Sequence, residues 1–360
     1  MDEHILRREE QAVFSLRELY GKYGYMPYKM SKFEELEYYI RNKDFLISDR
    51  IITFTDTNGK LLALKPDVTL SIIRNGEDVP GHKQKVCYNE NIYRISESTG
   101  QYKEIMQAGL ECIGDIDLYD VYEVVSLAAG SLALISEDFV LQISHMGILS
   151  GVLDRICSDS GFRSQAIACI ARKNAHDLRR LCQSFGIAED KTESLCRITE
   201  VCGERREVVE SLRPICADAA PEALAELETL SGLLDRLPWS ERIIYDFSVV
   251  NNMNYYSGIV FSGFLSGISD GVLSGGQYDK LMCKLGRASG AIGFAVYLNL
   301  LEQLPTEKQE YDVDVLLLYG NATDFAALTQ QVEMLVQSGK TVSVQKTVPG
   351  RLRWRELVQM

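Results

Sequence analysis

The order of strand-like and helix-like segments along the chain is the feature that most limits its fold. Short strand signals and hairpins dominate residues 1–150, helical spacing alone fills 151–240, and strand signals return at 243–250. In a parallel α/β sheet, by contrast, strands and helices alternate regularly along the chain. The sequence therefore predicts an α+β fold into which a helical segment is inserted.

The N-terminal part combines one helix with a series of hairpins. Apolar residues recur at helical spacing over 5–22, which predicts an amphipathic helix. The turn sequence DTNG lies between two strand-like runs, 50–55 and 60–64, and indicates a hairpin. The remaining predictions are helices at 68–74, 120–134 and 146–156, strands at 85–94, 104–113, 138–144, 243–250 and 258–264, a glycine turn at 274–278 and a helix over 290–301.

A polar linker at 302–310 precedes a small C-terminal segment. Its pattern predicts one βαβ unit, with a strand at 312–318, a helix near 324–335 and a strand at 341–344. From residue 311 onwards five lysines and arginines balance five aspartates and glutamates, so the segment shows no basic bias for RNA. The run RLRWRE within it is expected at the solvated end of a helix.

Charge and cysteine content argue against several classes of protein. The 38 lysines and arginines against 51 aspartates and glutamates give a net charge of −13, which disfavours a nucleic-acid partner. The N-terminal residues are charged, and no apolar stretch approaches the ~20 residues of a membrane span. Nine unpatterned cysteines indicate reduced thiols, and four dispersed histidines do not suggest a metal site. We therefore expect a cytoplasmic chain without a membrane partner.

Five segments, in this order along the chain, resemble the signature segments of the histidyl-tRNA synthetase family. They are LKPDVTLSIIR at 64–74, YRISESTGQYKEIMQAGLECIG at 93–114 (motif 2), NNMNYYSGIVF at 251–261, SGGQYDKL at 274–281 and GAIGFAVYLNLL at 290–301 (motif 3, GfGFAxGxERL in the family). The resemblance covers most of 1–305. It implies a class II aminoacyl-tRNA synthetase-like antiparallel sheet with flanking helices, the insertion at 151–240, and a short, truncated C-terminal α/β segment at 311–360.

The same resemblance implies an amino-acid pocket. The positions that hold the ligand in the family are occupied here by Asp67, Thr69, Gln107, Glu111, Tyr256 and Tyr278. Gln107 and Glu111 are four residues apart on an expected strand, so both can point to one face. Other roles stay open: Gln107 and Glu111 as half-buried strand polars, Asp67 as a helix cap, and Tyr256 as a core aromatic.

The groups that grip ATP in the family, in contrast, are mostly replaced. Leu300 and Asn299 stand in place of the arginine and glutamate that end motif 3, and Asn251 replaces the arginine of the first histidine signature. In motif 2, Ser96 and Gln101 replace a glutamate and an arginine. Guanidinium groups are the donors that match phosphate oxygens, so these losses should abolish adenylation and leave no catalytic residues. Arg94 remains, either as a residual anion site or, as we favour, as a structural ion-pair partner.

A pocket that binds an amino acid without activating it resembles a paralogous family, the regulatory subunits of short-form ATP phosphoribosyltransferase. That resemblance implies a non-catalytic subunit, with no cofactor and no metal, that activates a short catalytic subunit within a hetero-octamer. It would mediate histidine feedback on the first step of histidine biosynthesis. Motif 1, near 26–39, implies a homodimer core. Two alternatives are a divergent active histidyl-tRNA synthetase and a stand-alone histidine-binding or tRNA-binding module.

Overall fold

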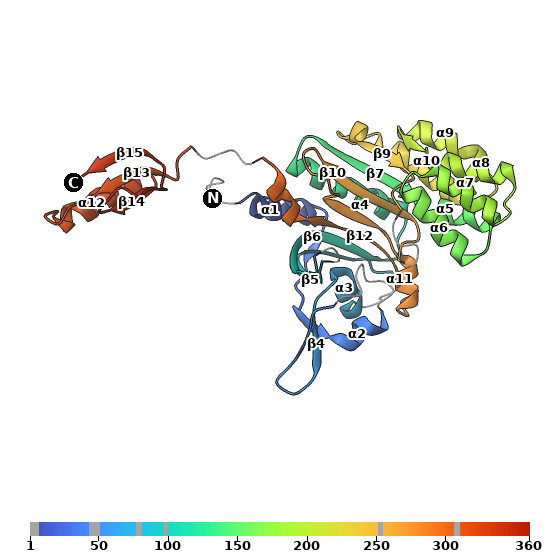
Figure 1. Cartoon of the computed structure of the whole chain (residues 1–360), viewed down its shortest axis with the longest axis horizontal. Coiled ribbons are helices and arrows are strands. Elements are labelled where there is room, and N and C mark those ends of the chain that lie inside the picture. The colour runs from blue at the N-terminus through green and yellow to red at the C-terminus, as the bar shows by residue number, and fades with distance from the viewer. Residues whose placement is uncertain (1–6, 43–50, 77–80, 97–98, 251–254, 306–309) are drawn as a thin grey trace. The chain divides into compact units, whose positions relative to one another are not determined.

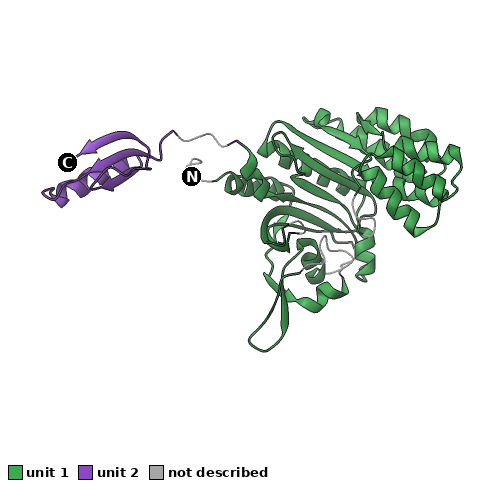
Figure 2. Cartoon of the chain, viewed as in Figure 1, with its two compact units in different colours: residues 1–304 green, residues 305–360 purple. Residues whose placement is uncertain are grey.

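The computed structural model describes residues 7–42, 51–76, 81–96, 99–250, 255–305 and 310–360. The chain divides into two compact units, Met1–Leu304 and Pro305–Met360, and Figure 2 shows them in different colours. In the described residues the first unit contains two sheets and the second unit one.

A large, mostly antiparallel sheet forms the centre of the first unit. In the described part of the chain it has nine strands in the order β1-β5-β6-β12-β11-β10-β7-β9-β8. Their bounds in this order are Met26–Pro27, Gln84–Ile95, Tyr102–Gly114, Gly290–Tyr297, Leu273–Gln277, Ile259–Leu265, Phe139–His145, Ile243–Asp246 and Cys202–Gly203. Only the β1–β5 and β7–β9 pairs are parallel among these strands. The predicted α+β class is confirmed.

Two helices, one amphipathic and one apolar, cover one face of this sheet. Helix α4 (Leu118–Ile135) begins at Asp117, whose side chain accepts hydrogen bonds from two backbone amides of the first turn. Helix α1 (Arg8–Lys22) packs beside α4, and the core between them includes Leu16, Val124 and Ala128. By length and composition α4 is a candidate membrane span, but most of it is buried inside the protein, as expected for a core helix.

The helical spacing over 151–240 corresponds to a cluster of helices at the β9 side of the sheet (Figure 1). It follows α5 (Met146–Ile156) and consists of α6 (Ser160–Ala171), α7 (Ala175–Ser184), α8 (Glu189–Ile198), α9 (Arg205–Cys216) and α10 (Pro221–Leu234). A short 3₁₀ helix, η3 (Ser240–Arg242), leads back into β9. His145, the N-cap of α5, contacts Glu226 of α10 and so links this cluster to the sheet.

A small antiparallel sheet and two short helices cover part of the opposite face. The strands are β2 (Phe33–Glu35), β4 (Leu61–Leu64) and β3 (Thr53–Thr55), and α2 (Leu36–Arg41) follows β2 directly. The predicted hairpin is confirmed, because Asp56 accepts hydrogen bonds from the amides of Asn58 and Lys60 and Gly59 adopts φ +81°. Helix α3 (Val68–Asn75) then lies against the large sheet through Leu70 and Ile73.

Two predictions near the end of this unit were wrong. The segment expected as a glycine turn at 274–278 is mostly strand β11, and the helix expected over 290–301 is strand β12 followed by a short 3₁₀ helix, η4 (Leu298–Gln303). Both strands lie in the middle of the sheet. The nearly continuous apolar run of β12 shows neither helical nor alternating periodicity, and the glycines of β11 resemble those of a turn. Their glycines allow close packing, since a Cβ on Gly275 would lie 2.4 Å from the carbonyl oxygen of Gly293.

The second unit is a three-stranded parallel sheet with one helix. Strand β13 (Val313–Leu318), helix α12 (Phe325–Gln337) and strand β14 (Val342–Gln345) confirm the predicted βαβ unit. The run RLRWRE does not end a helix as expected, because it enters a further strand, β15 (Trp354–Gln359), which pairs with β13. Arg353 pairs with Asp312 at the start of this ladder.

Candidate functional site

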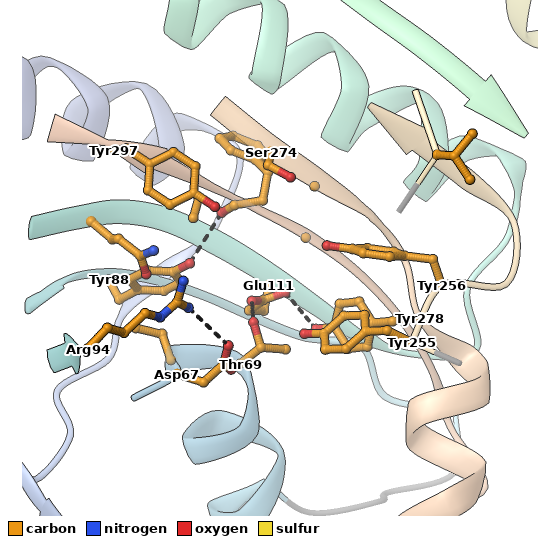
Figure 3. A pocket seen from close by; sticks show the side chains of 17 residues that line it. Asp67, Thr69, Tyr88, Arg94, Glu111, Tyr255, Tyr256, Ser274, Tyr278 and Tyr297 are labelled. Atoms are coloured by element: carbon orange, nitrogen blue, oxygen red, sulfur yellow. Dashed lines mark hydrogen bonds and ion pairs between the residues drawn. The ribbon is translucent and has the colours of Figure 1, made fainter. Parts of the chain in front are cut away.

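A cavity of about 450 Å³ opens on the face of the large sheet that carries α3. Figure 3 shows the side chains that line it. All six residues predicted as ligand-binding line this one cavity, and so does Arg94: Asp67, Thr69, Arg94, Gln107, Glu111, Tyr256 and Tyr278. They come from α3, the large sheet and the loops at its edge, so only the folded chain brings them together.

Strand β6 forms the floor of the cavity, because its side chains alternate between the two faces of the sheet. Leu110 and Cys112 point into the main core under α4, whereas Gln107 and Glu111 face the cavity. Across the neighbouring strand β12, Gln107 is opposite Tyr297 and Glu111 is opposite Gly293. The expectation that Gln107 and Glu111 share a face is therefore confirmed, and the missing side chain at Gly293 leaves room for the Glu111 carboxylate.

The Glu111 carboxylate lies at the centre of the hydrogen bonds in this cavity. It accepts one hydrogen bond from the Thr69 hydroxyl (2.7 Å) and one from the Tyr278 hydroxyl (2.6 Å), each on a different oxygen. No ion pair joins it to any cation in the described ranges. Burial raises the pKa of Glu111 to about 8, although the two hydroxyl donors oppose that shift. The side chain can therefore exchange a proton near neutral pH.

Asp67 caps α3, one of the roles that the sequence left open, and it also lines the cavity. As N-cap of α3 it accepts a hydrogen bond from the Leu70 amide (2.9 Å), and its other oxygen points into the cavity 3.8 Å from the Arg94 guanidinium. Arg94 also donates to the Pro66 carbonyl (3.1 Å). Burial raises the pKa of Asp67, and Arg94 partly counteracts this. Arg94 therefore has the structural role that we favoured, while it also lines the cavity.

Aromatic rings enclose the other end of the cavity, away from Arg94 (Figure 3). The rings of Tyr255 and Tyr256 are 4.6 Å apart and those of Tyr255 and Tyr278 5.7 Å apart, measured between centroids. Burial raises the pKa of all three tyrosines above its usual value, so their hydroxyls stay neutral at physiological pH. Such a cluster suits a flat ring that stacks and forms hydrogen bonds at its edge.

Sequence reasoning missed several residues of the cavity. Tyr88 from β5, Ser274 from β11 and Tyr297 at the end of β12 all line it. Tyr297 was detectable, because it replaces the third glycine of the motif 3 pattern. The helix wrongly expected over 290–301 hid its orientation, since alternation along a strand, and not helical spacing, turns its ring into the cavity.

The replaced ATP-contacting positions lie away from the cavity where the structure describes them. Leu300 belongs to η4 and packs against the main apolar core. Ser96 and Gln101 face each other at the turn between β5 and β6, where the Ser96 amide donates to the Gln101 carbonyl (2.8 Å). Asn251 lies outside the described residues. Of the described residues that line the cavity, Arg94 alone carries a positive charge.

Comparisons with known proteins agree with this architecture. The family model described as histidyl-tRNA synthetase matches residues 1–301. A curated relative from Oceanobacillus iheyensis, named ATP phosphoribosyltransferase regulatory subunit, is 28% identical over 94% of this chain and 85% of the relative.

Two solved structures show the same fold. One is an ATP phosphoribosyltransferase regulatory subunit/histidyl-tRNA synthetase from Bacillus halodurans, with a TM-score of 0.81, 24% identity and coverage of 98% of this chain and 93% of that one. Another is a chain of the ATP phosphoribosyl transferase (HisG:HisZ) complex from Thermotoga maritima, with a TM-score of 0.63, 20% identity and coverage of 81% and 97%. The family match extends over most of the first unit, including every described element of the large sheet and its cavity. The chain therefore belongs to the histidyl-tRNA synthetase family.

Proposed function

We propose that this chain is a non-catalytic regulatory subunit of ATP phosphoribosyltransferase and that its cavity binds free histidine. Relatives that match over almost the whole chain carry the regulatory-subunit name. One observation carries the proposal: the cavity has groups suited to an amino acid, while its single described cation is already engaged by Asp67 and Pro66.

The two ends of the cavity match the two ends of histidine. Arg94 offers a guanidinium to an α-carboxylate and Asp67 offers a carboxylate to an α-ammonium, both at one end. At the other end Tyr256 and Tyr278 flank the space for a ring, with Glu111 between the two ends. A cavity of about 450 Å³ is in the size range of small-molecule sites.

The same charges disfavour a nucleotide triphosphate. Its phosphates would meet two acidic side chains, Asp67 and Glu111, and one arginine among the described lining residues. Attack of the amino-acid carboxylate on the α-phosphate of ATP needs several cations placed around the phosphate oxygens. Each lost contact of this kind costs roughly 3–4 kcal/mol of transition-state stabilisation. We infer that the chain binds histidine without forming an adenylate.

The proposed partner is the short catalytic subunit of ATP phosphoribosyltransferase. The Thermotoga maritima chain of the same fold was solved in a complex that bears the name of that enzyme. We propose a hetero-oligomer, up to a hetero-octamer, built around a homodimer of this chain and located in the cytoplasm. Histidine bound in the cavity would then act as the effector, and its affinity would differ between the active and the inhibited complex.

Three measurements on the purified full chain test the proposal. Isothermal titration with histidine should show binding, and Arg94→Gln should weaken it. ATP–pyrophosphate exchange with histidine should be absent. Mixing with a short catalytic subunit should give a stable complex whose activity histidine reduces. Exchange activity would identify a synthetase instead, and tRNA binding without complex formation would indicate an RNA-binding module.

A further inference from the structure

We infer that Glu111 holds a proton in the empty cavity and transfers it to the ring of the bound ligand, so that the site selects a ring basic enough to accept it. The inference rests on the proposed function, in which free histidine is the ligand. Glu111 would then determine which amino acid binds, because a ligand whose side chain cannot take up a proton forms no ion pair with it.

The surroundings of Glu111 leave its negative charge uncompensated. Its side chain is only 2% exposed, and its two described hydrogen-bond partners are neutral hydroxyls. An isolated carboxylate at such a position is costly and tends to take up a proton instead. The raised pKa of Glu111, about 8, has this cause. Each carboxyl oxygen keeps one further position for a hydrogen bond to a ligand.

No neighbouring element provides a compensating positive charge within the described residues. From α3, Asp67 adds a second negative charge and Thr69 is neutral. Tyrosine hydroxyls with raised pKa values face Glu111 from β5, from the segment before β10 and from the end of β11; they belong to Tyr88, Tyr255, Tyr256 and Tyr278. On β12 the facing residue is Gly293. Along β6 the same face carries the uncharged Gly109 and Ile113, and beyond Gly109 the neutral Gln107. The Arg94 guanidinium pairs with Asp67.

The transfer balances without any additional reactant. The O–H bond of the Glu111 carboxyl group breaks, its proton forms an N–H bond with the unprotonated nitrogen of the imidazole ring, and a carboxylate and an imidazolium remain. Free imidazole has a pKa of about 6.5, so the ring arrives mostly neutral at pH 7. The product is a buried, hydrogen-bonded ion pair at Glu111, which has no ionic partner in the empty cavity among the described residues. A glutamine amide or a phenyl ring has no nitrogen that could accept the proton.

This proton transfer determines how many protons the protein and ligand exchange with the buffer on binding. Near pH 7 the proton moves inside the complex, so almost none should be exchanged with the buffer. At pH 9 the empty cavity has lost the proton and binding must take one up, which should weaken the affinity roughly tenfold. At pH 5 the ligand ring is already protonated and Glu111 must release its proton, so the affinity should fall roughly twentyfold relative to pH 7.

Calorimetry and NMR on the full chain separate this inference from its alternatives. Titration with histidine in two buffers of different ionisation heat gives the proton count at pH 7 and pH 9. Spectra of ¹⁵N-labelled histidine at pH 8 report whether the bound ring is imidazolium. We expect imidazolium in the wild-type chain, near-zero proton exchange at pH 7, and at least tenfold weaker binding of 2-fluorohistidine, whose ring has the same shape but little basicity.

Two variants, Glu111→Gln and the control Glu104→Gln, are compared with the wild-type chain. Glu111→Gln keeps the shape and should leave the bound ring neutral, bind histidine and 2-fluorohistidine with similar affinity, and lose the extra proton uptake at pH 9. The α-amino group of histidine titrates in both chains, so their difference reports Glu111 alone. Glu104→Gln, on the same strand but exposed and outside the cavity, should behave like wild type.

A neutral bound ring in the wild-type chain, or equal affinity for the two ligands, would overturn the inference while leaving the proposed function intact. If neither ligand binds at any pH, histidine is not the ligand and the proposed function fails first. The wild-type measurements do not depend on the variants, so a variant that fails to fold leaves the test decisive.

Discussion

A Cβ atom on Gly293 would lie 1.7 Å from Oε2 of Glu111, so the glycine of β12 leaves free the space that the carboxylate of β6 occupies. The two residues are direct cross-strand neighbours. Any side chain at position 293 must displace Glu111, together with its hydrogen bonds to Thr69 and Tyr278. The shape of the cavity therefore depends on the absence of a side chain on the strand opposite.

Gly293→Ala should accordingly destabilise the protein by about 3 kcal/mol and abolish histidine binding, because the added methyl group overlaps a buried side chain. Urea unfolding and calorimetric titration measure the two effects. The matched control is Gly232→Ala in α10, an exposed helical glycine with nothing within 4 Å of the added Cβ. Gly232→Ala should be as stable as wild type or slightly more stable, because alanine has a higher helix propensity than glycine. A Gly293→Ala chain as stable as wild type would contradict the steric argument.

Glu111 should make the protein less stable as pH rises. Its pKa is raised from 4.5 to about 8 in the folded state, so the folded chain binds a proton that the unfolded chain releases between these values. Stability from this group is complete below about pH 4.5 and is lost as pH rises through about 8. Glu111→Gln has no such titration. It should be more stable than wild type by about 4–5 kcal/mol at pH 8.5 and by less than about 1 kcal/mol at pH 5.

Urea unfolding of both chains at the two pH values measures this difference. Glu104→Gln serves again as the control, because Glu104 is exposed on the same strand. A gap between Glu111→Gln and wild type that does not change with pH would show that Glu111 has no raised pKa.

Tyr278→Phe should remove one of the two donors that hold the Glu111 carboxylate. The pKa of Glu111 should rise further, since this hydrogen bond lowers it. We expect a loss of about 1–2 kcal/mol that is larger at pH 8.5 than at pH 5, because the donor matters most to the ionised carboxylate. Tyr245→Phe removes a buried hydroxyl that donates to the Leu227 carbonyl far from the cavity. Tyr245→Phe should lower the free energy of unfolding by a similar amount at both pH values. If the two variants respond identically to pH, the Tyr278 hydroxyl does not preferentially stabilise the ionised Glu111 carboxylate.

The buried ion pair between Lys65 and Glu90 gives a fourth prediction. Lys65 is fully buried, and its ammonium lies 2.7 Å from the Glu90 carboxylate. Lys65→Met should destabilise the protein by about 3–5 kcal/mol, because it leaves Glu90 unpaired. Adding Glu90→Gln should recover part of that loss, since the uncompensated charge then disappears. Thermal and urea unfolding of wild type, both single variants and the double variant complete a double-mutant cycle, which measures the interaction energy between Lys65 and Glu90. A double variant no more stable than Lys65→Met would show that the uncompensated charge is not the cause.

Local sequence signals placed most elements correctly, and within the large sheet they failed at the two central strands β11 and β12. Helix α3, with its Asp67 cap, and the turn at Asp56 depend on neighbouring residues, and both could be predicted. The segment that forms β12 could not, because a continuous apolar run is compatible with a buried helix or a buried strand. Pairing with β6 and β11 on its two sides decides between them.

By itself, the sequence identified the residues that could recognise an amino acid, since the order and spacing of the matched segments are properties of the chain. It also showed that the arginines expected around a nucleotide are replaced, as at Leu300. Only the tertiary structure decided that Glu111 lies opposite a glycine, without a cationic partner among the described residues, and that Tyr297 turns into the same cavity. The reason is physical: the protonation of a carboxylate depends on the solvent, charges and hydroxyls within a few ångströms, and strands far apart in the sequence supply these surroundings.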